Sequence, residues 1–211
     1  MIEKLLNIIF PTVCGMCGKI DKRAICPKCY LRIKNEFKFY CINNNGYYLY
    51  FIGFYEGNLR ELILKYKFRE KSYLAEMFAR IIGKNDVFIK AFREYDYIVP
   101  VPMHSKNIKL RGYNQSELLC KMISKIYGIN IKNNCLFKKK ENKRQSKLNL
   151  TERINNVKNV YCVENAEQIK NKKILLLDDI YTTGNTVNEC IKELNKAKPS
   201  CIDVFVLAKT R

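Results

Sequence analysis

Several features are scarce or missing in this sequence of 211 residues. It has one histidine, and only 20 acidic residues stand against 39 basic ones. No stretch approaches the ~20 consecutive apolar residues that a membrane-spanning helix needs. The N-terminal "MIEKLLNIIFP" is too short in apolar residues for a secretory signal and lacks a small-residue cleavage site. We therefore expect no membrane span, and a cytoplasmic protein whose thiols are reduced.

The scarcity of acidic residues leaves a formal net charge of +19. Such an excess repels itself in a compact chain unless a polyanion or a phosphate ligand relieves it. One interpretation is a phosphate-rich partner, nucleic acid in particular. The other is a lysine-rich solvated surface that reflects composition alone, and the sequence leaves both open.

The apolar residues predict an α/β fold. Four segments carry them at i, i+3, i+4 and i+7, which predicts amphipathic helices that begin near Leu59, Leu74, Leu119 and Val187. Four short apolar runs predict strands buried on both faces: "YLYFIGF", "YDYIVPV", "KILLLDD" and "CIDVFVLA". Strands that alternate with helices predict a mostly parallel sheet. We expect two parts, which are a cysteine module (residues 1–45) and an α/β domain (residues 46–211).

The stretch "ILLLDDIYTTGNTV" sets Asp178 and Asp179 between an apolar strand and a loop of hydroxyls. Ligands of parallel sheets lie beyond the carboxyl ends of the strands. The loop precedes a helix, whose N-terminal N–H groups favour an anion, and Gly184 permits a tight turn there. Two carboxylates beside a phosphate make sense if they contact sugar hydroxyls or a divalent cation.

This acidic pair therefore predicts a site for a ribose phosphate, with Asp178 and Asp179 as the candidate catalytic residues. The candidate phosphate loop comprises Thr182, Thr183, Gly184, Asn185 and Thr186. The loop lacks the Gly-Lys-Ser/Thr of a Walker A motif and the GxGxxG of a dinucleotide turn. The alternative is a capped helix beside two solvated carboxylates.

A basic segment, "VPVPMHSKNIKLRGYNQ", follows another predicted strand, so its loop should open onto the same edge of the sheet. His104, Lys106 and Arg111 offer donors and charge for a diphosphate. As the single histidine of the chain, His104 is also a candidate general acid. A solvated basic loop is the alternative, and the next helix should start near Asn114.

Two further basic stretches are candidate DNA contacts. Lys65, Lys67 and Arg69 alternate with aromatic residues at a helix end, a pattern that suits single-stranded nucleic acid. Cations at a helix C-terminus also stabilise any helix, which is the other reading. The run "FKKKENKRQSK" (Phe137–Lys147) predicts a loop in which Lys143 and Arg144 attract DNA phosphates or help to cover a substrate, or do neither.

The cysteine module contains two CxxC pairs, whose members are Cys14, Cys17, Cys26 and Cys29. A two-residue spacing lets both thiolates of a pair bind one ion from a tight turn, and four cysteines are the usual ligands of structural zinc. We expect a zinc-ribbon-like module; an iron–sulfur cluster and redox thiols are the alternatives.

The stretch "ILLLDDIYTTGNT" resembles the phosphoribosyl pyrophosphate (PRPP) motif of the type I phosphoribosyltransferases (PRTases). The resemblance implies that Asp178 and Asp179 hold the ribose 2′- and 3′-hydroxyls. It further implies that residues 182–186 hold the 5-phosphate, and that Mg²⁺ accompanies PRPP on its diphosphate. The basic segment takes the place of the pyrophosphate loop in that family.

A second resemblance covers nearly the whole chain. The stretches "FYEGNLRELILKYKFRE", "YIVPVPMHSKNIKLRGYNQSELL" and "RQSKLNLTERINNV" resemble motifs of the ComF family of competence proteins. The family joins an N-terminal cysteine module to a PRTase-like domain and is associated with natural transformation and incoming single-stranded DNA. Many members carry a further cysteine pair, of which this chain has only Cys41.

The resemblance implies a protein that binds PRPP or a related ribosyl phosphate and acts in DNA uptake. Two alternatives remain at this point. One is an active PRTase that transfers ribose 5-phosphate to an unidentified nucleophile. The other is an adaptor whose cysteine module docks to competence or recombination proteins.

Overall fold

The computed structural model describes residues 13–44, 46–68, 71–139 and 160–211. Its α-helices are α2 (Pro27–Ile33), α3 (Gly57–Phe68), α4 (Leu74–Ile82), α5 (Asp86–Arg93), α6 (Ser105–Arg111), α7 (Gln115–Tyr127) and α9 (Asn185–Asn195). Its strands are β1 (Tyr40–Asn44), β2 (Tyr47–Phe51), β3 (Tyr97–Pro100), β4 (Leu136–Lys138), β5 (Tyr161–Val163), β6 (Lys173–Tyr181) and β7 (Cys201–Lys209). Two short 3₁₀ helices, η1 (Lys34–Glu36) and η3 (Ala166–Gln168), complete the described elements.

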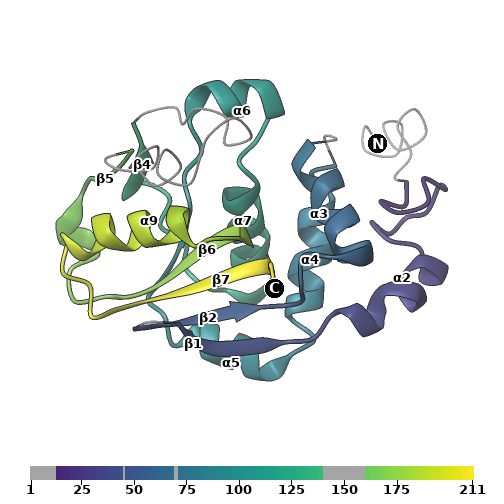
Figure 1. The fold of residues 1–211 in the computed structure, drawn as a ribbon, viewed down its shortest axis with the longest axis horizontal. Helices are drawn as coiled ribbons and strands as arrows, with labels where there is room; N and C mark the ends of the chain where they lie inside the picture. Colours follow the sequence, from purple (N-terminus) through teal and green to yellow (C-terminus); the bar gives the residue numbers. More distant parts are fainter. Residues whose placement is uncertain (1–12, 45, 69–70, 140–159) are drawn as a thin grey trace.

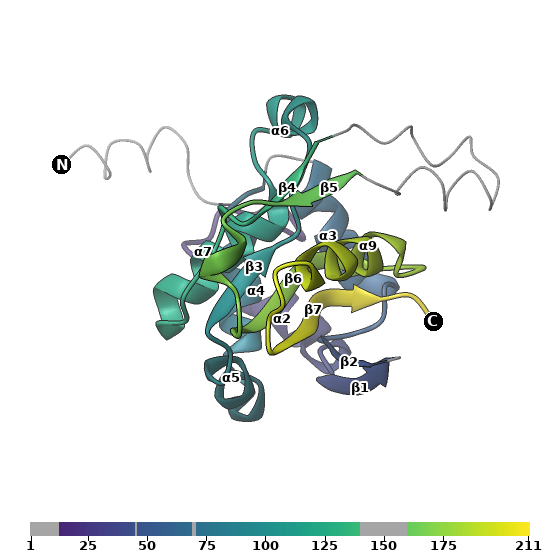
Figure 2. The same ribbon diagram turned by 90° about the vertical axis from the view of Figure 1, so that its left-hand side faces the viewer.

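Five strands form the central sheet in the order β1-β2-β7-β6-β3. β1 pairs antiparallel with β2, and the other neighbours pair parallel, so the sheet is mostly parallel as the sequence predicts. β4 and β5 form a separate antiparallel ribbon, which lies on the same side of the molecule as α6 (Figure 2). Figure 1 shows α3 between the sheet and the N-terminal segment that carries α2.

The strands are buried on both faces because their apolar residues alternate between two cores. Leu175 and Leu177 of β6 face the core that contains residues of α3, α4, α5 and α7. Ile174 and Leu176 face the opposite core, which contains residues of α9 and of the β4–β5 ribbon. Continuous apolar runs therefore mark these strands, since a parallel sheet is covered on both faces. The four strands and four helices that the sequence predicts are all present, and the expected α/β fold class is confirmed.

The cysteine module packs directly on the α/β domain. Cys14, Cys29 and Ile33 belong to the same buried cluster as Leu59 and Leu74 of α3 and α4. A Cβ atom at Gly15 would lie 2.6 Å from the Leu74 side chain, so the backbone of the cysteine module closely approaches α4 here. The division at residue 45 stays a proposal: β1 lies before it, yet pairs with β2, which lies after it.

Two segments differ from the sequence-based expectation. The basic segment, expected to be a loop, forms helix α6, because His104 caps its start and Gly112, with φ +82°, ends it. The basic run expected to loop from Phe137 begins inside β4, where Phe137 pairs with Cys162. The rest of that run beyond residue 139 lies outside the described residues.

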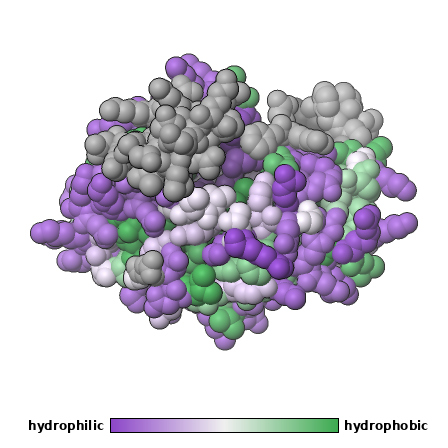
Figure 3. All heavy atoms as spheres, viewed as in Figure 1, coloured by the Kyte–Doolittle hydropathy of each residue, from purple (hydrophilic) through white to green (hydrophobic). Residues whose placement is uncertain are grey.

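Hydrophilic residues cover much of the coloured part of the face seen in Figure 3. Among the residues that the structure describes, no helix combines the length and apolarity needed to cross a membrane.

Candidate functional site

A cleft of about 1000 Å³ opens at the carboxyl end of β6. The ladder between β3 and β6 ends at the pair Pro100 and Leu177. The ladder between β6 and β7 continues to Tyr181 and Lys209. β6 therefore extends beyond β3, and the acidic pair lies in this extension at the floor of the cleft. The cleft volume is at the upper end of what small-molecule sites usually have.

Asp178 is held by groups from α7 and from its own backbone. The Ser116 hydroxyl donates to Asp178 Oδ1 at 3.0 Å. The backbone N–H of Asp179 donates to the same oxygen at 2.8 Å. Burial and the neighbouring Asp179 carboxylate raise the pKa of Asp178 to about 7, although Lys67 opposes this shift. The oxygen that Ser116 contacts is thus oriented before any ligand arrives.

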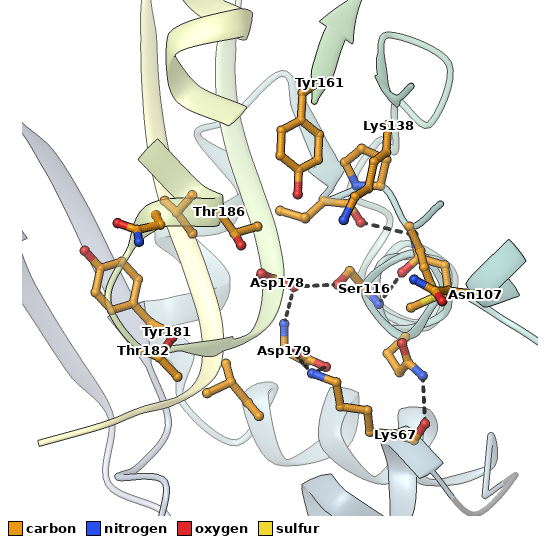
Figure 4. Close-up of a pocket in the computed structure, with 18 of the residues that line it drawn as sticks. Lys67, Asn107, Ser116, Lys138, Tyr161, Asp178, Asp179, Tyr181, Thr182 and Thr186 are labelled. Atoms are coloured by element: carbon orange, nitrogen blue, oxygen red, sulfur yellow. Dashed lines mark hydrogen bonds and ion pairs between the residues drawn. The ribbon is translucent and has the colours of Figure 1, made fainter. Parts of the chain in front are cut away.

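Asp179 is paired with a cation from another part of the chain. Lys67, in the last turn of α3, contacts Asp179 Oδ2 at 2.9 Å and Oδ1 at 3.2 Å. Figure 4 shows the two side chains pointing toward one another across the floor of the cleft. Burial opposes the charge of Lys67, but the two carboxylates outweigh it and raise the pKa of the lysine. The Lys67 ammonium group therefore neutralises part of the negative charge of the acidic pair.

The phosphate loop follows directly and leads into α9. Gly184 is the N-cap of α9 with φ +77°, a left-handed conformation that favours glycine. A Cβ atom at Gly184 would also collide with the Tyr181 ring. All five loop residues, 182 to 186, line the cleft. The N-terminal N–H groups of α9 therefore begin at the cleft, as an anion site requires.

A hydrogen-bonded cluster supports this loop from behind. The Tyr181 hydroxyl lies 3.1 Å from the Tyr47 hydroxyl and accepts from Asn44 Nδ2 at 3.1 Å. The Tyr47 hydroxyl donates to Asn188 Oδ1 in α9 at 3.2 Å. The β1–β2 hairpin thus holds both the residue before the loop and the helix after it.

The basic segment contributes to the cleft unequally. Arg111 lines the cleft together with Asn107 and Leu110 of α6. His104 instead accepts a hydrogen bond from the Lys106 backbone N–H with its Nδ1 atom, at 3.4 Å, and so caps α6. His104 and Lys106 are not among the residues that line the cleft. The diphosphate role of these three residues stays a prediction.

The structure brings Ser116 and Tyr161 to the cleft, and the sequence singled out neither of them. Asn114 caps α7, as expected, and its Nδ2 also donates to the Val101 carbonyl at 3.0 Å. This cap places Ser116 against Asp178. Lys138 and Tyr161 of the β4–β5 ribbon line the opposite wall, with the ammonium 5.5 Å from the ring centroid (Figure 4). The sequence could indicate Asn114, because a helix cap is a local signal. The contacts of the β4–β5 ribbon depend on tertiary structure.

The DNA candidates in α3 make contacts within the chain. Lys65 donates to the Met16 carbonyl in the cysteine module at 2.8 Å. Lys67 contacts Asp179 as described. Arg69, Lys143 and Arg144 lie outside the described residues. A role for these five residues in binding DNA stays a prediction.

The four predicted metal ligands come together in the structure. The sulfur atoms of Cys14, Cys17, Cys26 and Cys29 all lie within 4.8 Å of one another. A tetrahedral site with metal–sulfur distances of about 2.3 Å has sulfurs roughly 3.8 Å apart, and those of Cys17 and Cys26 are 3.9 Å apart. This cluster could therefore hold a metal ion. Cys41 lies apart, exposed on β1.

Backbone groups support this cysteine cluster. Burial opposes ionisation of Cys14, but N–H groups of Cys17, Cys26 and Met16 outweigh it and lower the pKa of the thiol to about 6. Burial and the neighbouring sulfurs raise the pKa of Cys29 to about 12. The second pair starts α2, with Cys26 as N-cap and Pro27 at the first turn. Gly18, with φ +74°, closes the first turn.

Comparison with known proteins agrees with this geometry. The family model of the phosphoribosyl transferase domain matches residues 125–211. Competence protein F of Haemophilus influenzae is 28% identical, over 90% of this chain and 92% of its own length. Competence protein ComFC of Streptococcus pneumoniae is 28% identical, over 93% and 80%. DNA utilization protein YhgH of Escherichia coli is 24% identical, over 94% and 90%.

Among solved structures, glutamine PRPP amidotransferase from B. subtilis matches with a TM-score of 0.42 and 14% identity, over 68% of this chain and 30% of that one. The α/β sheet and the matched domain give the chain the fold of the type I PRTases. Within that class, its resemblance to the ComF family is confirmed, because the curated relatives named for competence align with nearly all of it.

Proposed function

We propose that the cleft binds PRPP or a related ribosyl phosphate. The carboxylates of Asp178 and Asp179 accept the ribose hydroxyls, and residues 182–186 bind the 5-phosphate. The observation that carries this proposal is the acidic pair at the floor of the cleft beside the N-terminus of α9. Carboxylates accept but do not donate hydrogen bonds, whereas the helix N-terminus offers donors, so the two subsites select opposite ends of one ligand.

Mg²⁺ accompanies the ligand in this proposal. Mg²⁺ is usually bound through substrate phosphates and retained water, and it neutralises charge on a departing diphosphate. Arg111 lines the cleft and offers a bidentate fork to the same group. Whether the site also catalyses transfer to a nucleophile depends on an acceptor, which these residues do not identify.

Calorimetric titration with PRPP and Mg²⁺ tests the ligand. We expect the wild-type chain to bind and the double variant Asp178→Asn, Asp179→Asn to lose measurable binding. Asp96→Asn is a matched control, because Asp96 also pairs with a lysine, Lys172, but precedes β3 at the opposite end of the sheet. Equal affinity in the double variant and the wild type would overturn the ribose assignment.

We propose zinc as the metal of the cysteine cluster. Support comes from the four sulfur ligands and from their spacing, which fits tetrahedral coordination. Cys14, Cys17, Cys26 and Cys29 would hold the ion, which supplies a structural cross-link. Metal analysis of the purified chain should give one zinc per chain, and iron in its place would contradict the proposal.

We also propose a role in competence-linked DNA uptake in the cytoplasm, with single-stranded DNA as a partner. Support comes from the names of the relatives and from the net charge of +19. Binding of labelled single strands should weaken steeply with salt, because each neutralised phosphate releases counterions. Affinity that does not change with salt would contradict an electrostatic contact. Docking to other competence proteins through the cysteine module is the remaining candidate.

A further inference from the structure

The last turn of α3 contacts two functional regions at once. Lys65 and Lys67 are two residues apart, so their side chains leave the helix roughly 200° apart. Lys65 Nζ donates to the Met16 carbonyl at 2.8 Å, whereas Lys67 Nζ contacts Asp179 Oδ2 at 2.9 Å. Figure 1 shows α3 between the N-terminal segment and the rest of the domain. One turn of helix thus joins the cysteine cluster to the acidic pair.

The contact on the cysteine side is made through a single peptide unit. Met16 lies between Cys14 and Cys17, and its carbonyl shares a planar peptide group with the N–H of Cys17. Cys17 itself supplies one of the four clustered sulfurs. The carbonyl of the same unit accepts from Lys65. Rotation of this peptide would therefore move the backbone that carries the Cys17 sulfur and break the contact with the lysine.

Lys65 depends on this peptide for its placement. Lys65 is 8% exposed. A buried ammonium group must be paired or hydrogen-bonded. Lys65 Nζ also pairs with Glu61 Oε1, one turn earlier on α3, at 2.6 Å. Glu61 moves with the helix, so the Met16 carbonyl is what ties Lys65 to the cysteine module.

The other side of the turn is tied to α7. Gln115 Nε2 donates to the Lys67 carbonyl at 3.1 Å. The Tyr66 hydroxyl donates to the Gln115 carbonyl at 2.7 Å, and the Tyr113 hydroxyl donates to the Tyr66 carbonyl. The last turn of α3 is thus held by the cysteine module on one side and by α7 on the other.

Lys67 matters to a phosphate ligand because of charge. Two adjacent carboxylates repel a polyanion, and a cation at 2.9 Å from one of them reduces that repulsion. The same contact orients the Asp179 oxygens toward the floor of the cleft (Figure 4). Lys67 lines the cleft beside the acidic pair, so a shift of its ammonium group would weaken binding of a ribosyl phosphate.

We propose that the last turn of α3 couples the cysteine cluster to the ribosyl phosphate site, with Lys65 and Lys67 as positioning residues. The coupling rests on the proposed function of the cleft. When the four sulfurs hold a metal ion, the Met16–Cys17 peptide is fixed, Lys65 is held, and Lys67 stays against Asp179. Coupling between two binding sites is reciprocal, so a bound ribosyl phosphate also tightens the hold on the metal.

The first test compares PRPP affinity, with Mg²⁺ present, in the metal-loaded full chain and in three variants: Lys65→Met, Lys67→Met and the double variant. Methionine keeps the apolar stem and removes the ammonium. We expect each single variant to bind about tenfold more weakly, within the usual range of coupling between sites. We expect the double variant to bind as Lys67→Met does, because Lys65 acts through Lys67.

Lys121→Met is the matched control, since Lys121 also pairs with a glutamate four residues earlier, Glu117, on a helix surface. It should bind PRPP as the wild type does. Metal content should be unchanged in all variants, which separates positioning from loss of the cluster. Additive losses in the double variant, or wild-type affinity in Lys65→Met, would overturn the coupling and leave the proposed function intact.

The second test measures the coupling at the metal site, and its main comparison uses the wild-type chain alone. Transfer of metal from the wild-type chain to a chromophoric chelator is followed with and without PRPP and Mg²⁺. We expect PRPP to slow transfer severalfold, and Lys65→Met to abolish this protection. Equal transfer with and without bound PRPP would overturn the coupling. A wild-type chain that does not bind PRPP at all would overturn the proposed function and the coupling with it.

Discussion

The cysteine cluster and the acidic pair both bring groups of like charge together, and each is compensated differently. Four sulfurs lie within 4.8 Å of one another, with backbone N–H groups directed at Cys14. Asp178 accepts from the Ser116 hydroxyl, and Asp179 pairs with the Lys67 ammonium. The acidic pair thus receives a cation from the chain itself, whereas the cysteine cluster is built to receive one from solution.

This difference in the source of the counter-charge determines whether each site can fold before its ligand binds. A site whose counter-charge lies in the chain can fold before its ligand arrives. A cluster of four cysteines folds together with its metal, because a site preformed for the metal rarely exists in the unfolded chain. We therefore expect loss of metal to affect stability most, and loss of the ribosyl phosphate to affect it least.

The largest expected effect comes from Cys14→Ser combined with Cys26→Ser. Metal content should fall to near zero, because each CxxC pair loses one ligand. The melting temperature should fall by about 10 °C or more, since a loss of roughly 4 kcal/mol has that effect in a chain of this size. Metal analysis and thermal unfolding followed by circular dichroism measure both. Cys41→Ser, exposed and outside the cluster, is the control; a double variant that keeps its metal contradicts the site.

Asp179→Asn tests the internal cation. The variant removes the carboxylate that Lys67 contacts at 2.9 Å. We expect the free energy of unfolding to fall by about 2 kcal/mol, less than for a fully buried pair, because the Lys67 side chain is 23% exposed. Asp96→Asn, which breaks a more exposed pair with Lys172, should cost less than about 1 kcal/mol. Equal losses in urea unfolding would mean that burial adds nothing to the Lys67 contact.

Asp178→Asn should act in the opposite direction and depend on pH. The pKa of Asp178 is raised to about 7 in the folded chain, from an ordinary value of 3.8. Between about pH 4 and pH 7 the folded chain keeps a proton that the unfolded chain has released, so the wild type loses stability as pH rises, with no further loss above pH 7. The asparagine variant has no such proton. Its stability relative to the wild type should therefore increase from pH 5 to pH 8 by roughly 2 kcal/mol in urea unfolding. Parallel pH profiles would contradict the raised pKa.

Much of the fold could be predicted from the sequence because its signals are local. The apolar runs of β6 and β7 and the helical spacing from Leu119 mark buried elements directly. The β4–β5 ribbon carried no such signal. Its strands are three residues each and are stabilised by tertiary packing, as the burial of Leu136 and Tyr161 in the second core shows.

The residues of the candidate site also divide into those with a local sequence signal and those without one. Short sequence motifs contain Cys14, Cys17, Asp178 and Gly184. The spacing within each motif indicates the chemistry of the site. Lys67 lies 112 positions before Asp179 in the sequence, and in the helix it looked like an ordinary cation near a C-terminus. The contact between Lys67 and Asp179 depends on how α3 packs in the folded chain. The spacing of residues along the sequence cannot specify that packing.

The smallest expected effect comes from Tyr181→Phe, which tests whether the β1–β2 hairpin supports the phosphate loop. The variant keeps the ring beside Gly184 and removes the hydroxyl that contacts Tyr47 and Asn44. We expect the free energy of unfolding to fall by about 1 kcal/mol, the usual value of one hydrogen bond, and PRPP affinity to fall by less than about fivefold.

Tyr48→Phe, on β2 next to Tyr47 but 50% exposed, should leave both unchanged. If Tyr181→Phe instead weakened PRPP as much as Lys67→Met does, the support behind the phosphate loop would matter as much to the ligand as the cation beside the acidic pair. The molecule would then contain three kinds of site. The acidic pair is compensated by a lysine of the chain, the cysteine cluster depends on a metal, and the phosphate loop is positioned by neutral hydrogen bonds.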